Sequence, residues 1–381
     1  MRRDLSELTA LAARGLVQMF DPATNLFCAR LVRTPNGLVR QDQSPRYTMM
    51  TLLGLREREK SGKQIPFDSQ AIYRSFVRDT SWIKGVGDFG LLLWLTAEFD
   101  QDNLNALFEK FDPKHALSQF EDGQKRSTTE LAWFLAGLSH AAQASNSLAS
   151  KLTDIAVQTF RLTQNNQRDS GFFGHLGTFN SMPGLVRGRI GSFADQVYPI
   201  YSFSKFAQAF HEDQALGSAL KCAQAICDAQ GDLGQWWWLY DSASGRVSSR
   251  YPVYSVHQYA MAPMALFALE RVSGTDFQPY ISRGLDWIYG HNEISLDMRD
   301  LAHNVVWRCI RPSSKSVKYK DVLSSFFKAP TLAEPVRNLE VLYEDWPYEL
   351  GWLLYAFSNN ELRTVAENES TPVSAVNQLH T

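Results

Sequence analysis

The chain has 381 residues, of which 44% are hydrophobic and 20% charged, and its formal net charge is -2. This composition is typical of a soluble globular protein and excludes an intrinsically disordered one. The near-neutral charge provides no basic surface for nucleic acid or for an anionic membrane. We therefore expect the partner to be a small molecule or an oligosaccharide.

The apolar segments and the cysteines give no sign of a membrane-spanning, secreted or zinc-binding protein. No apolar run is long enough to cross a bilayer, and Asp4 and Glu7 interrupt the only stretch that could serve as a signal peptide. The four cysteines form no CxxC pair, so neither a zinc knuckle nor a disulfide scaffold is indicated. These features predict a cytoplasmic protein without a metal or another cofactor.

Helical periodicity runs through most of the chain, whereas strand signals are scarce. Apolar residues recur at intervals of three and four, the pattern of helices that bury one face. The even-numbered helical segments are apolar nearly all round, and the odd-numbered ones carry more charge. The predicted helices cover residues 4–19, 45–58, 68–81, 88–99, 103–119, 127–145, 147–163, 192–210, 213–229, 253–272, 276–290 and 342–358.

The joints between these helices alternate in length. Short joints follow the even-numbered helices, whereas most odd-numbered helices are followed by long ones, such as 20–44 and 291–341. In an up-and-down ring of hairpins, all odd-to-even joints lie at one end. The pattern predicts an all-α protein, an (α/α)6 toroid of six helical hairpins over 1–358, with the even-numbered helices inside. A flexible polar tail is expected at 359–381, and function is expected at the end with the long loops.

A short motif supports this architecture. Residues 230–236 read Gln-Gly-Asp-Leu-Gly-Gln-Trp and match the QxxxGxW repeat of triterpene cyclases, and residues 167–173 form a looser copy one hairpin earlier. The chain thus resembles the α/α-toroid superfamily, which includes terpenoid cyclases and protein prenyltransferase β subunits and shares its architecture with many six-hairpin glycan-active enzymes. The resemblance implies a double ring of helices, but toroids carry out unrelated reactions.

Polar and ionisable side chains gather where the even-numbered helices begin, so a ring would bring them together in one funnel. Helix capping accounts for Ser44, Ser127 and Glu344, because such residues satisfy the free amides of a first turn. Capping is an equally good explanation for Glu130 and Asp345. It does not account for four further residues at these positions: Arg46, Tyr198, Tyr254 and His257.

Two pairs within this set suggest acid and base roles. Tyr254 and His257 are three residues apart, which places them on one face of a helix, and Asp195 and Tyr198 have the same spacing. Histidine is the natural proton shuttle near neutral pH, although a histidine among apolar residues is often a hydrogen-bonded core residue. The predicted catalytic residues are Asp195, His257, Tyr254, Glu130 and Asp345.

Two carbohydrate chemistries fit these residues. Glycoside cleavage needs two carboxyl groups on opposite sides of the bond. The candidates for these are Asp195, Glu130, Asp345 and Glu349. A lyase or epimerase acting on a uronic acid instead needs a Tyr or His base and a cation to neutralise the carboxylate. The candidates for that set are Tyr254, His257, Tyr198 and Arg46.

Aromatic residues complete the predicted site. Trp236, Trp237 and Trp238 lie in a long loop at the functional end, where flat rings are able to stack on sugars or on an isoprenoid chain. If this loop is extended, Trp236 and Trp238 share one side; alternatively, the rings pack the loop onto the toroid. The predicted substrate-binding residues are Arg46, Tyr47, Tyr198, Trp236, Trp238, Gln258, Trp346 and Glu349.

Three functions are compatible with this site. The favoured one is a carbohydrate-active enzyme, either a glycoside hydrolase, a polysaccharide lyase or a uronyl epimerase. A terpenoid cyclase-like enzyme is weakened because the DxDD and DDxxD motifs are absent. The third is a non-catalytic module that binds a glycan or a lipid. The segment 294–341, which contains Trp307 and the basic run 315–320, is a candidate lid.

Overall fold

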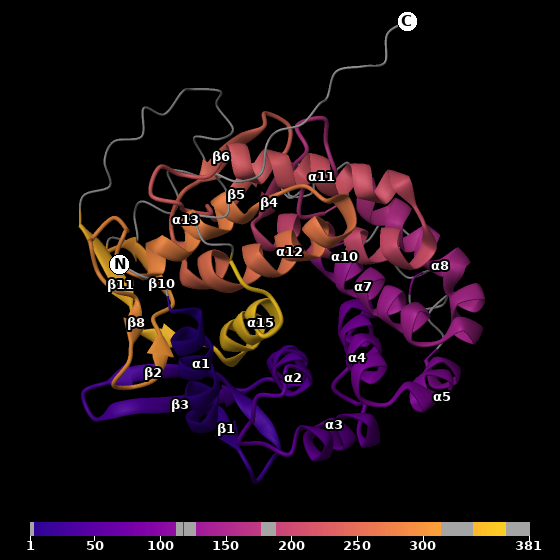
Figure 1. Ribbon diagram of the computed structural model, residues 1–381, viewed down its shortest axis with the longest axis horizontal. Helices are drawn as coiled ribbons and strands as arrows, with labels where there is room; N and C mark the ends of the chain where they lie inside the picture. The colour runs from indigo at the N-terminus through magenta and orange to yellow at the C-terminus, as the bar shows by residue number, and fades with distance from the viewer. Residues whose placement is uncertain (1–3, 112–116, 118–126, 177–187, 314–337, 363–381) are drawn as a thin grey trace, which may run out of the picture.

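The computed structural model describes residues 4–111, 117, 127–176, 188–313 and 338–362 (Figure 1). Within these ranges the protein is mostly helical, with short strands in the connections. Its helices are α1 (Leu5–Met19), α2 (Pro45–Lys60), α3 (Ser69–Arg78), α4 (Val86–Phe99), η1 (Gln101–Asn103), α5 (Leu104–Lys110), α7 (Thr128–Ala144), α8 (Asn146–Gln164), α10 (Ala194–Phe210), α11 (Asp213–Asp228), the π-helical turn η2 (His257–Met261), α12 (Ala262–Ser273), α13 (Gln278–Ile288) and α15 (Pro347–Phe357). None of these described helices is long and apolar enough to span a membrane.

The strands lie in the long joints of the chain. They are β1 (Phe20–Asp21), β2 (Leu26–Thr34), β3 (Gly37–Gln43), β4 (Ile190–Ser192), β5 (Leu239–Asp241), β6 (Arg246–Ser249), β7 (Val253–Tyr254), β8 (Arg299–Asp300), β9 (Val305–Val306), β10 (Cys309–Pro312), β11 (Leu339–Leu342) and β12 (Glu344–Asp345). All pairings are antiparallel, and β12 pairs with the distant β2 through Asp345 and Leu31. The sequence analysis predicted none of these strands. Some form local hairpins, such as β2 with β3, whereas others, such as β12 with β2, pair with distant segments.

The predicted helices correspond closely to the described ones, with three exceptions. The helix expected over 253–272 begins only after β7, the strand that contains Tyr254, and the π-helical turn within it begins at His257. The helix expected over 342–358 begins at Pro347, and Asp345 lies in β12. The helix expected over 103–119 is described to Lys110, and most of its later part, like the tail after 362 and the basic run 315–320, lies outside the described residues.

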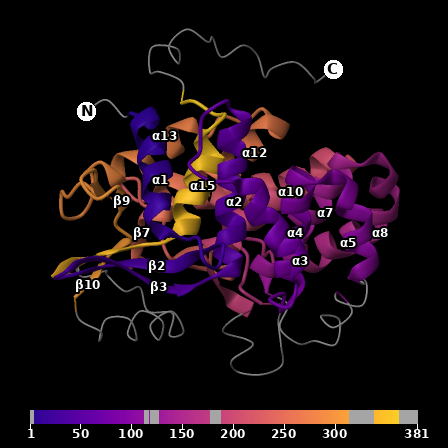
Figure 2. The same cartoon turned by 90° about the horizontal axis from the view of Figure 1, so that it is seen from below.

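Six helices pack around a closed cycle. Helix α2 contacts α4, α4 contacts α7, α7 contacts α10, α10 contacts α12, and α15 contacts both α12 and α2. Helices α3, α5, α8, α11 and α13 lie outside this cycle (Figure 1). We call the end where the inner helices begin the mouth. Strands β2 and β3, which pair with each other, and β10 all lie at this end (Figure 2).

Paired glycines allow two close contacts in the inner ring. A Cβ atom added to Gly54 of α2 would lie 1.9 Å from the carbonyl oxygen of Gly351 on α15. A Cβ atom on Gly137 of α7 would lie 2.1 Å from the carbonyl oxygen of Gly90 on α4. Real Cβ atoms do not approach backbone this closely, so these helix pairs require glycine at the crossing points.

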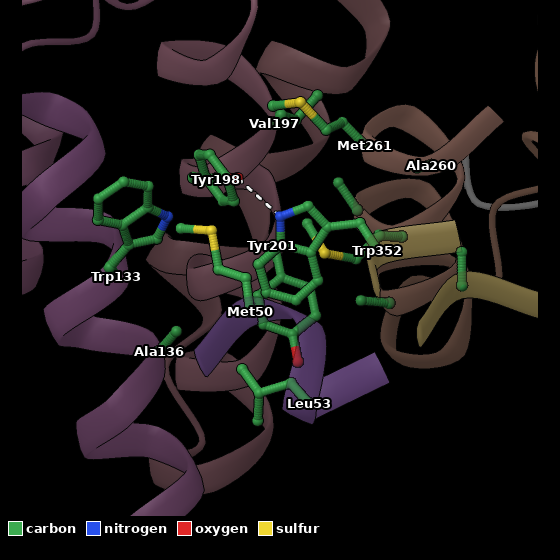
Figure 3. Close-up of a cluster of buried hydrophobic side chains, with 14 of the residues drawn as sticks. Met50, Leu53, Trp133, Ala136, Val197, Tyr198, Tyr201, Ala260, Met261 and Trp352 are labelled. Carbon is green, nitrogen blue, oxygen red and sulfur yellow. Dashed lines mark hydrogen bonds between the residues drawn. The ribbon is translucent and has the colours of Figure 1, made fainter. Parts of the chain in front are cut away.

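Apolar and aromatic side chains fill the interior of the ring (Figure 3). Trp352 is fully buried, and its indole N–H donates a hydrogen bond to the hydroxyl of Tyr198 at 3.0 Å. Figure 3 shows side chains from several inner elements meeting at this level: Met50, Leu53, Trp133, Ala136, Val197, Tyr198, Tyr201, Ala260, Met261 and Trp352. The ring is packed here, so a ligand has to bind at one of its ends.

The QxxxGxW motif has a structural role that its looser copy repeats. The side-chain amide of Gln230 donates to the carbonyl oxygens of Gly234 and of Tyr280 on α13, both at 3.0 Å. Gln167 makes the same pair of bonds, to Gly171 at 3.0 Å and to a carbonyl of α11 at 2.9 Å. Both glycines have a positive φ, near +90°. Each motif therefore ties the end of one outer helix to the next outer helix.

The inner helices continue this repeat. Gln196 of α10 accepts from the backbone N–H of Phe173 at 2.8 Å and donates to its carbonyl at 3.0 Å. Gln258 of η2 accepts in the same way from the N–H of Trp236 at 3.0 Å and donates to its carbonyl at 3.3 Å. The motif and its copy are thus devices that hold loops to the ring, and their presence carries no implication of cyclase chemistry.

Candidate active site

A charged cluster opens to solvent at the mouth, where three inner helices begin. Arg46 in the first turn of α2 donates from Nε to Oδ1 of Asp88 on α4 at 2.6 Å, and its Nη2 lies 3.9 Å from Oε1 of Glu130 on α7. The guanidinium lies over the ring of Trp133, 5.2 Å from its centroid. The side chains of Arg46 and Glu130 are 37% and 31% exposed, so both are accessible to a ligand. We call this group the Arg46 cluster.

A histidine–aspartate pair lies beside this cluster. Asp195, in the first turn of α10, is fully buried, and its carboxylate lies 3.1 Å from Nδ1 of His175. It also accepts hydrogen bonds from the hydroxyl of Thr129 and from the N–H and hydroxyl of Ser192, each at 2.8 Å. Burial opposes ionisation of Asp195, but the bonds from His175 and Ser192 outweigh it, so the pKa of Asp195 is lowered.

The ionised Asp195 determines how His175 is able to react. A carboxylate beside Nδ1 holds the proton there and leaves Nε2 as the basic nitrogen of the neutral ring. The His175 side chain is 32% exposed, in contrast to its buried partner. The pair therefore has the geometry of an oriented general base on a partly exposed side chain.

Glu130 supplies a complementary acid. Burial raises its pKa, Arg46 lowers it, and Asp88 raises it again, so that the net direction is upward. The charge of His175 also acts on Glu130, which places the two groups in the same part of the mouth. A carboxylic acid with a raised pKa next to an oriented histidine is an arrangement suited to proton transfer.

A second charged group, the Arg308 cluster, lies at the same end of the ring. Arg308 precedes β10, and its Nη1 lies 2.5 Å from Oε1 of the fully buried Glu349 in the first turn of α15. Its guanidinium lies over the rings of Trp346, at 3.3 Å, and Tyr254, at 5.2 Å. Burial raises the pKa of Glu349 to about 7 even though Arg308 lowers it. Glu349 therefore exchanges its proton near neutral pH.

His257 lies in the wall behind this cluster. The centroid of its ring lies 4.5 Å from the ring centroid of Phe193 and 5.1 Å from that of Tyr254. Burial lowers the pKa of His257 to about 3, and burial raises that of Tyr254 to about 12. Both side chains are therefore uncharged at neutral pH, and His257 is only 6% exposed. Their predicted catalytic roles stay predictions.

Aromatic rings connect the two clusters. The ring of Tyr47, next to Arg46, lies 5.4 Å from that of Trp346 and 4.7 Å from that of Tyr348. The charges of Arg308 and Arg46 both act on the Tyr47 hydroxyl, whose pKa burial raises. The Arg46 and Arg308 clusters are thus two parts of one site at the mouth, with Tyr47 between them.

Besides Asp195, Glu349 and His257, four more predicted site residues are buried. Asp345, Trp236 and Gln258 are 0% exposed and Tyr198 is 4% exposed. One carboxylate oxygen of Asp345 accepts from the N–H of Val306 at 3.0 Å, and burial raises its pKa well above the ordinary value. The roles predicted for these four residues stay predictions, and the burial of their side chains does not favour contact with a substrate. Trp238 is partly exposed, and its ring lies 6.5 Å from that of Tyr254.

The sequence analysis missed three residues of the site: Asp88, His175 and Arg308. Asp88 lies at the start of the helix predicted over 88–99, and it accepts from the N–H of Lys84 at 3.1 Å as well as pairing with Arg46. His175 and Arg308 lie in long joints, where periodicity carries no signal. Only the fold brings them to Asp195 and Glu349. No group of three or more His, Cys, Asp or Glu residues able to hold a metal occurs among the described residues.

Comparisons with known proteins identify the fold. No family model matches the sequence, and no curated protein sequence matches it either. A possible member of the GH105 family from Salmonella enterica serovar Paratyphi A has a structure that is similar at a TM-score of 0.60 and 11% identity. That alignment covers 93% of this chain and 92% of the other.

Two further structures are similar over the same extent. An unsaturated glucuronyl hydrolase from a Bacillus species that degrades glycosaminoglycan has a TM-score of 0.56 and 14% identity, covering 93% and 94% of the two chains. A cellobiose 2-epimerase from Bacillus thermoamylovorans has a TM-score of 0.60 and 10% identity, covering 93% and 98%. At such low identity the likeness shows a shared fold, so this chain has the mostly helical architecture of α/α-toroid proteins.

Proposed function

We propose that the protein is a carbohydrate-active enzyme that moves protons to and from a sugar bound at the mouth of an (α/α)6 toroid of six hairpins. The observation that carries this proposal is the His175–Asp195 pair beside Glu130 and Arg46. The closed cycle of inner helices supports the six-hairpin architecture. Two of the structures similar to this chain are named as an unsaturated glucuronyl hydrolase and a cellobiose 2-epimerase, which favours a glycan substrate.

The proposed roles follow from the environment of each group. His175 accepts a proton at Nε2 while Asp195 stabilises the imidazolium that forms. Glu130, with its raised pKa, is the group that donates a proton to the sugar. Arg46, half-exposed and already next to two carboxylates, stabilises negative charge that develops on the sugar.

Glycoside hydrolysis and sugar epimerisation both need such an acid and such a base, so both belong to the proposal. A terpenoid cyclase is not favoured, because the QxxxGxW motif is accounted for by its hydrogen bonds to the outer helices. If the protein binds a glycan but does not turn it over, the proposed fold stands and the proposed catalytic function is refuted.

The test is incubation of the purified protein with unsaturated glucuronyl disaccharides and, separately, with cellobiose in deuterated water. Hydrolysis releases free sugars, whereas epimerisation by proton exchange introduces deuterium at the reacting carbon, and NMR distinguishes them. We expect His175→Ala and Glu130→Gln to reduce turnover at least about 100-fold, and His211→Asn, a change of an exposed histidine, to have no effect. Full activity in both mouth variants, or the absence of turnover with any glycan, would contradict the proposal.

A further inference from the structure

An open groove lies beside the mouth, along the strands that lead into α15. Its volume is ≈ 570 Å³, within the range of roughly 300–1,000 Å³ that is usual for ligand sites. It is lined by β11, by the start of β12, and by parts of β2, β10 and the loop after α13. None of the residues assigned to the acid–base site above lies in this lining.

The groove lies next to the mouth, and Glu344 links the two. Glu344 lines the groove, and its Oε2 accepts a hydrogen bond from the indole N–H of Trp346 at 3.1 Å. Trp346 in turn supports the guanidinium of Arg308 and lies beside the ring of Tyr47. A chain molecule that extends from the mouth past Trp346 would therefore come close to Glu344 in the groove lining.

The groove also combines exposed apolar surface with planar charged groups. Tyr343 is 41% exposed and Leu296 is 38% exposed, which makes them two of the few large hydrophobic side chains so exposed among the described residues. The rim carries the ion pair between Nε of Arg311 and Oε1 of Glu340, at 2.9 Å, with both side chains more than a third exposed. Such a surface offers a ring for the C–H face of a sugar and bidentate groups for its hydroxyls.

Tyr343 is held in position before any ligand binds. The guanidinium of Arg33 lies over its ring at 5.2 Å and over the ring of Trp307 at 5.8 Å, and the two rings meet edge-on at 5.1 Å. The backbone carbonyl of Tyr343 also accepts from the N–H of Arg33 at 3.0 Å. A ring that is already ordered loses little entropy when it stacks on a ligand.

We propose that this groove binds the continuation of an oligosaccharide whose reacting end lies at the mouth, and that Tyr343 is its stacking platform. The inference rests on the proposed function and specifies its substrate as a glycan longer than a disaccharide. The balance of two arginines and two glutamates on the groove matches a ligand of hydroxyl groups and apolar ring faces better than a strongly charged polymer.

The test compares kcat and KM for substrates of increasing length, from disaccharide to hexasaccharide, in the full-length protein. We expect KM of the wild type to fall with length, and Tyr343→Ala to raise KM for the longer substrates about tenfold. The kcat values and the KM for the disaccharide should stay unchanged. Tyr343→Phe should retain the wild-type length dependence, and Leu301→Ala, a change of an equally exposed residue outside the groove, is the matched control.

The possible failures can be told apart. If no substrate of any length is turned over, the proposed function fails; binding of a hexasaccharide to the wild type and to Tyr343→Ala, measured by calorimetry, then still tests the groove. Equal length dependence in the wild type and in a folded Tyr343→Ala variant would overturn the groove proposal. So would a wild-type dimer, detected by sedimentation, that Tyr343→Ala dissociates without changing the length dependence, because the groove would then be an interface between copies.

Discussion

Acidification should destabilise this protein through the buried His257. Its ring is 6% exposed, and its Nδ1 lies at 3.5 Å from the carbonyl oxygen of Trp236, which offers little compensation for a charge. The pKa of His257 in the folded protein is lowered to about 3 by burial, against 6.5 for an ordinary histidine. The unfolded chain therefore binds a proton between these pH values that the folded protein excludes.

The sign and size of the effect follow from this difference. Because the folded-state pKa lies below the unfolded-state value, the full stability is present above pH 6.5 and is lost as pH falls from 6.5 towards 3. Each pH unit in this window costs about 1.4 kcal/mol, so His257 alone should cost about 3 kcal/mol at pH 4.5. That is a large share of the roughly 5–15 kcal/mol by which domains are stable.

The assay is urea unfolding followed by tryptophan fluorescence at pH 7.5 and pH 4.5. His257→Gln keeps an uncharged donor of similar size, so we expect it to lose about 3 kcal/mol less than the wild type between the two pH values. His211→Asn, at an exposed position with left-handed backbone that asparagine tolerates, should follow the wild type. An identical loss in the wild type and in His257→Gln would refute the reasoning.

Two further predictions concern the ring and the Arg308 cluster. Gly54→Ala should destabilise the protein by more than about 3 kcal/mol or prevent folding, because the added methyl group meets the backbone of Gly351. The control Gly217→Ala, in an open helical position, should be neutral or stabilising by about 1 kcal/mol. Chemical unfolding measures the free energy of unfolding of both variants. Glu349 has the opposite linkage to His257: its pKa in the folded state, about 7, is raised, so its contribution to stability is lost as pH rises from 4.5 to 7. Glu349→Gln should therefore reduce the loss of stability between pH 5 and pH 8 by about 3 kcal/mol, and an unchanged loss would contradict the burial argument.

Local periodicity was sufficient to locate the helices, because each inner helix buries nearly its whole surface and each outer helix one face. Helix α2 was predicted over 45–58 and is described over Pro45–Lys60, and α11 was predicted over 213–229 and is described over Asp213–Asp228. The alternating joint lengths were sufficient to suggest which residues share an end. Arg46 and Glu130, predicted from helix starts alone, do come within 3.9 Å.

The rest of the site depends on pairings between distant segments, which no local pattern contains. β12 forms only because β2 lies beside it, and this pairing moves Asp345 out of the expected helix into a buried strand. His175 reaches Asp195 because its own joint folds back over α10, with its N–H bonded to the carbonyl of Ile190. Two carboxylates predicted at helix starts thus have different environments. Asp345 is fully buried, whereas the side chain of Glu130 is accessible at the mouth.

Asp195 illustrates this difference and permits a direct test. The sequence analysis placed it among the catalytic residues, but the structure buries it fully and surrounds its carboxylate with Thr129, Ser192 and His175. If it positions His175, then Asp195→Asn should lower kcat about 10²–10⁴-fold with little change in KM, because the amide no longer fixes the proton on Nδ1. If kcat and the thermal stability of Asp195→Asn both fall, and a change of pH restores neither, the role of Asp195 is purely structural. Asp241→Asn, which removes a buried carboxylate of β5 that pairs with Arg189, provides the comparison for loss of a buried acid alone.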